Sequence, residues 1–189
     1  MKIIKNIQLL LITVLMVTSC GQNKEAKNDT NLGDEPALTS QSKTKAIDIA
    51  SIKKKLCNDF PEDLILKYNP DGKKIEIEPI DDGSGGILHC KVKLFYGEKE
   101  YQFWEGLVTA NINNMKDPFW QYNPKRNPTL YQEVEGLGDR AVFIGNMFQL
   151  QILKEGVMYN ITPPNRGRTT NTGKETKAIA IEIAQHYQL

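Results

Sequence analysis

The chain has 189 residues and a formal net charge of +1, and its lysines and arginines are scattered along the sequence. This balance gives no indication of a nucleic-acid partner or of electrostatic binding to a membrane. Two histidines and three cysteines are too few and too far apart for a zinc site, and no cofactor motif is present. The sequence therefore predicts neither a metal nor a cofactor.

The N-terminus has the three parts of an export signal. Lys2 and Lys5 precede an apolar run over 7–17, which is shorter than the ~20 residues of a membrane-spanning helix. Aliphatic and small residues then lead to Cys20, an order that resembles the lipobox of bacterial lipoproteins. The resemblance implies that residues 1–19 are a signal peptide and that Cys20 becomes the lipidated first residue, carrying palmitate and diacylglycerol. It also implies a cell-envelope protein held to a membrane, with a plain secretory signal or an uncleaved anchor as the alternative.

Residues 20–45 carry almost no large apolar side chains, so they cannot bury enough surface to offset the entropy of folding. We predict a disordered tether over this range and a single head domain over 46–189. The head begins with a predicted helix that has Asp48 as its N-cap, and a second short helix follows Pro61. The buried face of the first helix is expected to hold Ile49, Ile52 and Leu56.

The middle of the head has the alternation of half-buried strands. Pro79 indicates that the first strand lies at an edge of the sheet. A capping box over 172–175 predicts a last helix that runs to about Tyr187. The expected fold is an α+β domain in which an antiparallel meander is packed by N-terminal and C-terminal helices. Its strands are predicted over 73–80, 88–94, 101–112, up to Ile144, 149–152 and 157–161.

The order of the elements, with Gly136-Leu137-Gly138-Asp139 as a turn and a pair of cysteines, resembles the small bacterial lipoproteins of the PsbP-like α+β class. The resemblance covers about Ile47–Leu189 and implies a fold more than a function. The aromatic segment over 117–124 departs from that pattern.

Cys57 and Cys90 remain as a pair once Cys20 is assigned to the lipid. In an exported protein we favour a disulfide between them, with two buried free thiols as the alternative. Such a bridge would fasten the first helix to the sheet.

Two loops carry candidate partner-binding residues. The aromatic one is a candidate anchor for an envelope protein or a candidate platform for stacking on a sugar. Its alternative is a loop folded onto the sheet over Phe103 or Leu107. The basic one suits phosphate groups, with a solvated loop as its alternative. The residues are Phe119, Trp120 and Tyr122 in the first loop and Arg166 and Arg168 in the second.

The histidines, His89 and His186, match no nucleophile motif, so we do not predict an enzyme. A cleft that pairs His89 with Asp139 or Glu105 would change this interpretation. The sequence indicates a non-enzymatic, lipid-anchored envelope protein with a binding or accessory role. The alternative is a carrier that holds a small apolar or sugar ligand between sheet and helices.

Overall fold

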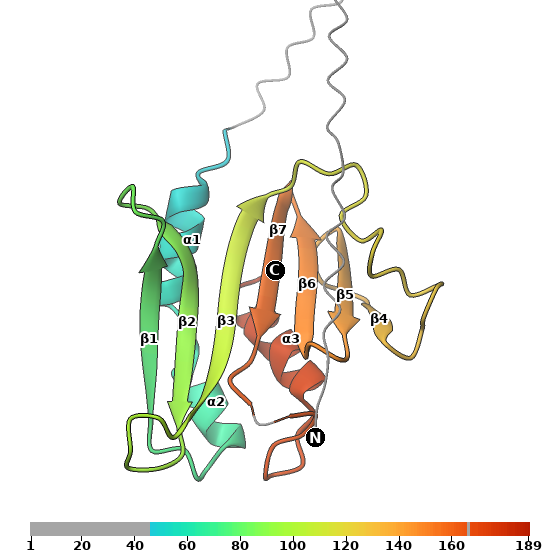
Figure 1. The fold of residues 1–189 in the computed structure, drawn as a ribbon. Helices are drawn as coiled ribbons and strands as arrows, with labels where there is room; N and C mark the ends of the chain where they lie inside the picture. The colour runs from blue at the N-terminus through green and yellow to red at the C-terminus, as the bar shows by residue number, and fades with distance from the viewer. Residues whose placement is uncertain (1–45, 166) are drawn as a thin grey trace, which may run out of the picture. The chain divides into compact units, whose positions relative to one another are not determined.

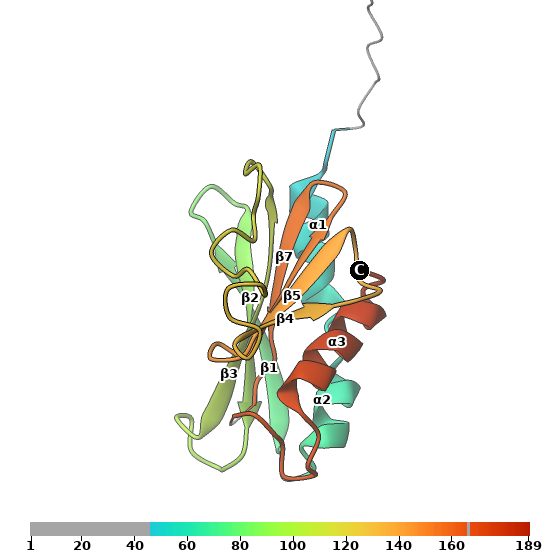
Figure 2. The same ribbon diagram turned by 90° about the vertical axis from the view of Figure 1, so that its right-hand side faces the viewer.

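A seven-stranded antiparallel sheet carries three helices on one of its faces (Figures 1 and 2). The computed structural model describes residues 46–165 and 167–189, so the predicted signal peptide, Cys20, the predicted tether and Arg166 lie outside the described residues. The helices are α1 (Ile49–Asn58), α2 (Glu62–Tyr68) and α3 (Thr176–His186). The strands are β1 (Lys74–Asp81), β2 (Ile87–Phe95), β3 (Phe103–Ile112), β4 (Tyr131–Val134), β5 (Arg140–Ile144), β6 (Gln149–Lys154) and β7 (Val157–Thr162).

The strand order is β1-β2-β3-β7-β6-β5-β4, which makes two meanders joined in the middle of the sheet. After β3 the chain crosses along 113–130 to the far edge and returns strand by strand until β7 pairs with β3 (Figure 1). The α+β class and the edge position of β1 are confirmed. The predicted antiparallel meander is present within each half of the sheet, but the crossing from β3 to β4 was not expected. Strand β4 was not expected either, because four residues are too few for alternation to be recognised.

The helices pack on the face to which every second side chain of the central strands points. Cys90, Val92 and Leu94 of β2 are buried there, while Lys91 and Lys93 point to the other face. Burying each large aliphatic side chain contributes about 1.5–3 kcal/mol, so this layer carries most of the stability. Its completely buried members include Ile65, Leu150, Ile152, Ile161, Ile179 and Ile183.

Helix α1 is held at both ends, as its sequence predicts. The carboxylate of Asp48 accepts a hydrogen bond from the backbone N–H of Ser51 at 3.0 Å. Near the other end a disulfide joins Cys57 to Cys90 of β2, with their Cα atoms 5.5 Å apart. The helix is therefore fastened to the sheet by a covalent bond as well as by burial.

Helix α3 confirms the predicted buried stripe but not the predicted capping box. The helix begins at Thr176 after Glu175, whose side chain makes no capping bond. The hydroxyl of Thr172 instead donates to the carbonyl of Tyr68 at the end of α2. The hydroxyl that the local pattern assigned to the cap of α3 therefore bonds to α2 instead.

Glu182 of α3 links this helix to α2. Burial alone would raise the pKa of its carboxyl, but hydrogen bonds from Lys174 and Tyr68 outweigh burial and hold the pKa below its ordinary value. The Lys174 Nζ atom lies 2.6 Å from one carboxylate oxygen, and the Tyr68 hydroxyl lies 2.9 Å from the other. The charged carboxylate is therefore part of the folded state.

The segment Gly136-Leu137-Gly138-Asp139 is a tight turn between β4 and β5. Gly136 and Gly138 have φ values of 79° and 53°, which is the region that favours glycine. Asp139 accepts from the N–H of Glu155 at 2.8 Å, so its carboxylate joins this turn to the β6–β7 turn. This bond gives the segment a structural role.

Candidate functional site

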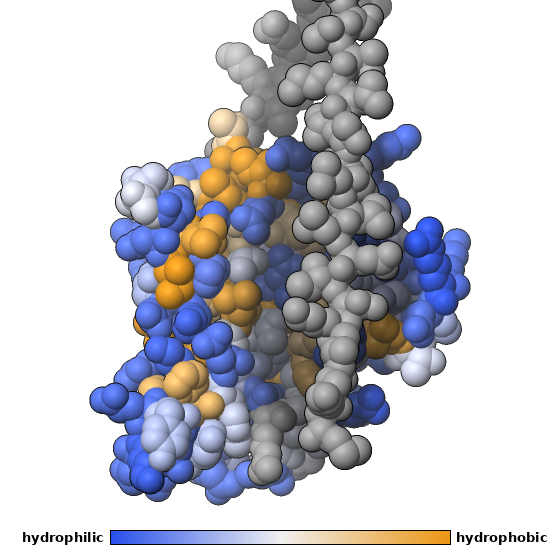
Figure 3. All heavy atoms as spheres, in the orientation of Figure 1, coloured by the Kyte–Doolittle hydropathy of each residue, from blue (hydrophilic) through white to orange (hydrophobic). Residues whose placement is uncertain are grey.

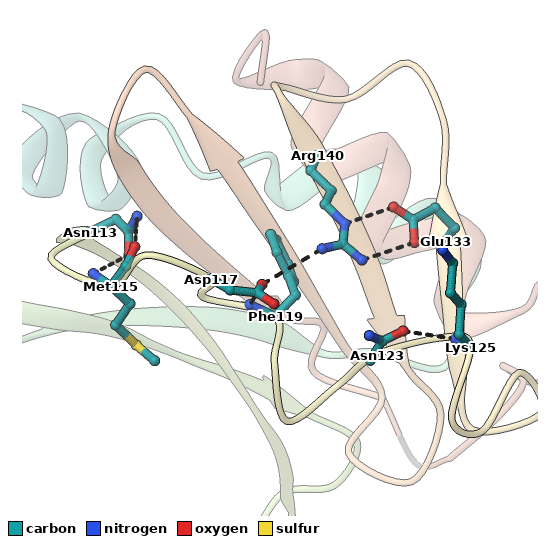
Figure 4. Close-up of polar contacts among 8 residues, drawn as sticks. All are labelled: Asn113, Met115, Asp117, Phe119, Asn123, Lys125, Glu133 and Arg140. Atoms are coloured by element: carbon teal, nitrogen blue, oxygen red, sulfur yellow. Dashed lines mark hydrogen bonds and ion pairs between the residues drawn. The ribbon is translucent and has the colours of Figure 1, made fainter.

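The loop over 113–130, which we call the aromatic loop, folds against the sheet face opposite the helices (Figure 2). Phe119 is 1% exposed, and its ring lies 4.7 Å from the guanidinium carbon of Arg140 on β5. The carboxylate of Asp117 accepts from the N–H of Phe119 at 3.1 Å (Figure 4). Phe119 is therefore the side chain that anchors this loop to the sheet.

Arg140 is the centre of this anchor. Its Nε atom donates to the Glu133 carboxylate on β4 at 2.9 Å, and a terminal nitrogen lies 3.8 Å from the Asp117 carboxylate (Figure 4). The Arg140 side chain is 35% exposed, so each ion pair contributes at most about 1 kcal/mol. The pairs set the position of the loop, while the burial of Phe119 supplies most of the energy.

Asparagine and aspartate side chains shape the rest of the aromatic loop. Asn113 accepts from the N–H of Met115, Asn123 from that of Lys125 and Asn127 from that of Leu130. Each such bond closes a local turn, and these residues also tolerate turn conformations. The repeated Asx residues are the signal in the sequence that could have predicted an ordered loop.

The structure separates the three aromatic candidates. Phe119 is buried in the described structure, which argues against its predicted role as a contact residue. Tyr122 is half-buried, with its ring edge-on to Tyr131 at 5.6 Å. Trp120 is 48% exposed and is the aromatic side chain of this segment that a partner could reach.

The loop is folded onto the sheet, as the alternative predicts. Its anchor is Arg140 of β5, whose guanidinium also pairs with Glu133 of β4, whereas the alternative had placed the loop over β3. The ring of Phe103 instead packs 5.5 Å from that of Phe95, within the β2–β3 hairpin. Strand alternation could not reveal which strands would lie beneath the loop, because that depends on the strand order.

Arg168 lies beside the end of the aromatic loop, although the two are far apart in sequence. It is exposed and lines a groove of about 650 Å³ between the β4–β5 edge and the start of α3. Inside the groove the ammonium of Lys177 donates to the amide oxygen of Gln132 at 2.9 Å. The sequence had suggested only Arg168 among the residues of this groove. The other groove residues are Asn127, Thr129, Leu130, Phe143, Gly145, Asn146, Phe148 and Glu175.

Charged side chains fill the open face of β1, β2 and β3. Lys93 lies 2.8 Å from Glu78, and its hydrogen bond lowers the pKa of that carboxyl. Lys91 lies 3.6 Å from Glu105. Elsewhere in the head, the carboxylate of Asp139 accepts a hydrogen bond from the backbone N–H of Glu155. Among the described residues, neither Glu105 nor Asp139 forms an ion pair with His89, which is the pair that would have suggested catalysis.

Within residues 46–165 and 167–189, no group of three or more histidine, cysteine, aspartate or glutamate side chains is placed to hold a metal ion. No helix of this part of the chain is long and apolar enough to cross a membrane. Comparison of the chain with protein-family models, with curated proteins and with solved structures found no match.

Proposed function

We propose that the chain is a non-enzymatic, lipid-anchored protein of the bacterial cell envelope whose head binds a protein partner through the aromatic loop. The lipobox at Cys20 supports the anchor and the location. The observation that carries the binding role is Trp120, a large aromatic side chain that is 48% exposed beside the buried Phe119. Tryptophan is enriched among residues that dominate interface energies.

The order of the aromatic loop favours binding. Its Asx bonds and the Phe119 anchor hold it before a partner arrives, so association does not have to order the backbone. Trp120 is the contact in this proposal, and Phe119 holds the loop that presents it.

A photocrosslinking amino acid at position 120 tests the binding role in intact cells. The matched control carries the same group at Tyr101, which is 70% exposed on the β2–β3 turn. We expect a discrete crosslinked protein from position 120 that is absent from position 101. Excess unlabelled wild-type head should suppress this product, whereas the same excess of the Trp120→Ala head should not. Equal products from both positions, or no product from position 120, would contradict this role of the loop.

The lipid anchor has its own test. Cys20→Ser removes the thiol that would be acylated, so this variant should leave the membrane fraction while its head stays folded. The mass of the N-terminal peptide of the wild type should show the added acyl chains. Membrane retention of Cys20→Ser equal to that of the wild type would remove the anchor from the proposal.

The proposal also assigns the head to the PsbP-like α+β class. The order of the elements supports this assignment, with a disulfide between the first helix and the sheet, a glycine turn before β5, and α3 last. An experimental structure of the head with another strand order would withdraw this support.

A second candidate function, a small-ligand carrier, is favoured by the groove beside Arg168. The space between sheet and helices is filled by buried side chains, whereas the groove has the volume of a small-molecule site. Phe148 offers an apolar surface in it, and Gln132 and Asn146 offer amides that suit sugar hydroxyls. Titration with a disaccharide panel should shift the amide NMR signals of Gln132 and Asn146, and unchanged signals for every sugar would reject this function.

A further inference from the structure

Large apolar side chains that solvent reaches gather at one end of the head. Ile47, Leu88, Ile112 and Met115 are each between 37% and 49% exposed. We call these four residues the apolar pole. They lie at the end where the chain enters α1, and Figure 3 shows apolar side chains gathered there over the ends of β2 and β3.

Backbone and side-chain contacts bring three members of the apolar pole together around the β6–β7 turn. Ile112 ends β3 opposite Val157, and the N–H of the next residue, Asn113, donates to the carbonyl of Gly156 at 2.8 Å. The Asn113 side chain bonds in turn to the backbone of Met115. The Ile47 side chain reaches the same turn, because a Cβ atom added at Gly156 would lie 3.5 Å from it.

Leu88 reaches the apolar pole through the antiparallel pairing of β2 and β3. The start of β2 lies beside the end of β3, since Cys90 is opposite Val108. An irregularity in the β1–β2 register pairs Ile80 with His89 and Asp81 with Ile87, which leaves Leu88 without a partner on β1. Its side chain is exposed despite the apolar alternation of the strand.

Ionisable groups of both signs lie on the segments that end at the apolar pole. Lysine side chains and carboxylates both occur, and Lys53 is close enough to Asp82 to lower the pKa of that carboxyl, after the larger effect of its bonds to Ser84. A surface of mixed sign favours apolar contact over charge in what this end binds. The groups include Asp48, Asp81, Asp82, Asp117, Asp139 and Glu155 with Lys53, Lys116, Arg140 and Lys154.

The occupant follows from where the chain leaves the head. Cys20 precedes Ile47 by 27 residues, which fully extended span at most ~97 Å. A lipid on Cys20 therefore keeps the apolar pole within this distance of the bilayer and makes their contact an intramolecular event, so a weak apolar contact is still well populated. The other exposed apolar side chains lie on the β2–β3 turn, on the β5–β6 turn and, at Trp120, further along the aromatic loop.

We propose that the apolar pole rests on the lipid surface to which Cys20 holds the chain. This inference rests on the lipid anchor of the proposed function. The contact inserts Met115 and its three neighbours among the lipid headgroups and acyl chains. Because Met115 lies in the aromatic loop, five residues before Trp120, the contact also sets the height of Trp120 above the membrane.

The test uses the mature chain, residues 20–189, on phosphatidylcholine vesicles. Its N-terminal cysteine is condensed with a lipid-bearing cyanobenzothiazole, which requires the free amine and leaves internal thiols available, so the result does not depend on lipidation by the cell. An NBD fluorophore is attached at Met115→Cys or, as the matched control, at Tyr101→Cys on the opposite end of β2 and β3. Both positions are exposed, so the label need not disturb the core.

We expect the NBD emission at position 115 to rise at least threefold with a blue shift on vesicles and to be quenched by brominated lipid. The label at position 101 should keep its aqueous emission. Adding Leu88→Asn and Ile112→Asn should return the signal at position 115 to the aqueous value, with an unchanged far-UV circular dichroism spectrum.

Three results would overturn the inference. Aqueous emission at both positions, while the chain floats with the vesicles, would show a head that stands away from the lipid. Equal emission at both positions would show contact without orientation. A blue shift at position 115 that rises with protein concentration in the absence of vesicles would show that a second copy covers the pole. Whether cells lipidate Cys20 is measured separately, by the Cys20→Ser fractionation and the mass of the N-terminal peptide. A negative result there would contradict the proposed function and not the contact of the apolar pole with lipid.

Discussion

Phe119→Ala tests whether the aromatic loop is an integral part of the folded head. The ring is 1% exposed and lies on Arg140, so it is the buried contact that fastens the loop to the sheet. Truncation should loosen the loop and lower the free energy of unfolding of the head.

The structure sets the size of the effect. Truncating a fully buried phenylalanine in a core costs about 3–5 kcal/mol. Phe119 packs at the periphery, where the loop can partly collapse, so we expect the lower value of ~3 kcal/mol. Contact with the Arg140 guanidinium supplies at most about 1 kcal/mol of this loss, because that group is partly exposed.

Urea unfolding followed by far-UV circular dichroism measures the loss. With an m-value of about 2 kcal/mol per molar, the unfolding midpoint should fall by roughly 1.5 M. Trp120→Ala is the matched control, because it removes a similar ring from the same loop at an exposed position, and it should cost under about 1 kcal/mol. A midpoint for Phe119→Ala equal to that of Trp120→Ala would refute the anchoring role of Phe119.

Three further predictions concern the head. Replacing Cys57 and Cys90 together by alanine should cost about 4 kcal/mol for a separation of 33 residues, and a loss below ~1 kcal/mol in urea unfolding would contradict the bridge. Glu182→Gln should lower the free energy of unfolding at neutral pH. The difference from the wild type should shrink as the pH falls below 4.5 and through the lowered pKa, since protonation removes the charge that the fold stabilises. A difference that stays constant to acid pH would contradict this reason. Gly138→Ala should cost about 2 kcal/mol more than Gly136→Ala, because only at position 138 would a Cβ atom meet the Leu153 carbonyl, and equal melting temperatures would reject that clash.

Local patterns in the amino-acid sequence are sufficient to identify most elements of the head. Asp48 caps α1 because the cap needs only a side-chain oxygen three residues before the N–H it accepts from. The stripe of Ile179 and Ile183 and the alternation around Cys90 depend on spacings within one helix or strand. The disulfide is predicted from the number of cysteines in a chain with a predicted export signal. All of these depend on residues close in sequence or on simple counts.

The strand order and the role of each loop residue were decided only in three dimensions. Phe119 and Trp120 are adjacent aromatics with the same local pattern, yet one is buried because Arg140, 21 residues further along the chain, lies beneath it. Thr172 does not form the predicted capping box because its hydroxyl donates to the carbonyl of Tyr68 at the end of α2. Arg168 lines a groove with Gln132 because β4 returned at the far edge of the sheet. These contacts stabilise the fold through pairs of residues that are far apart in sequence. The periodicity of side chains along the chain therefore does not predict them.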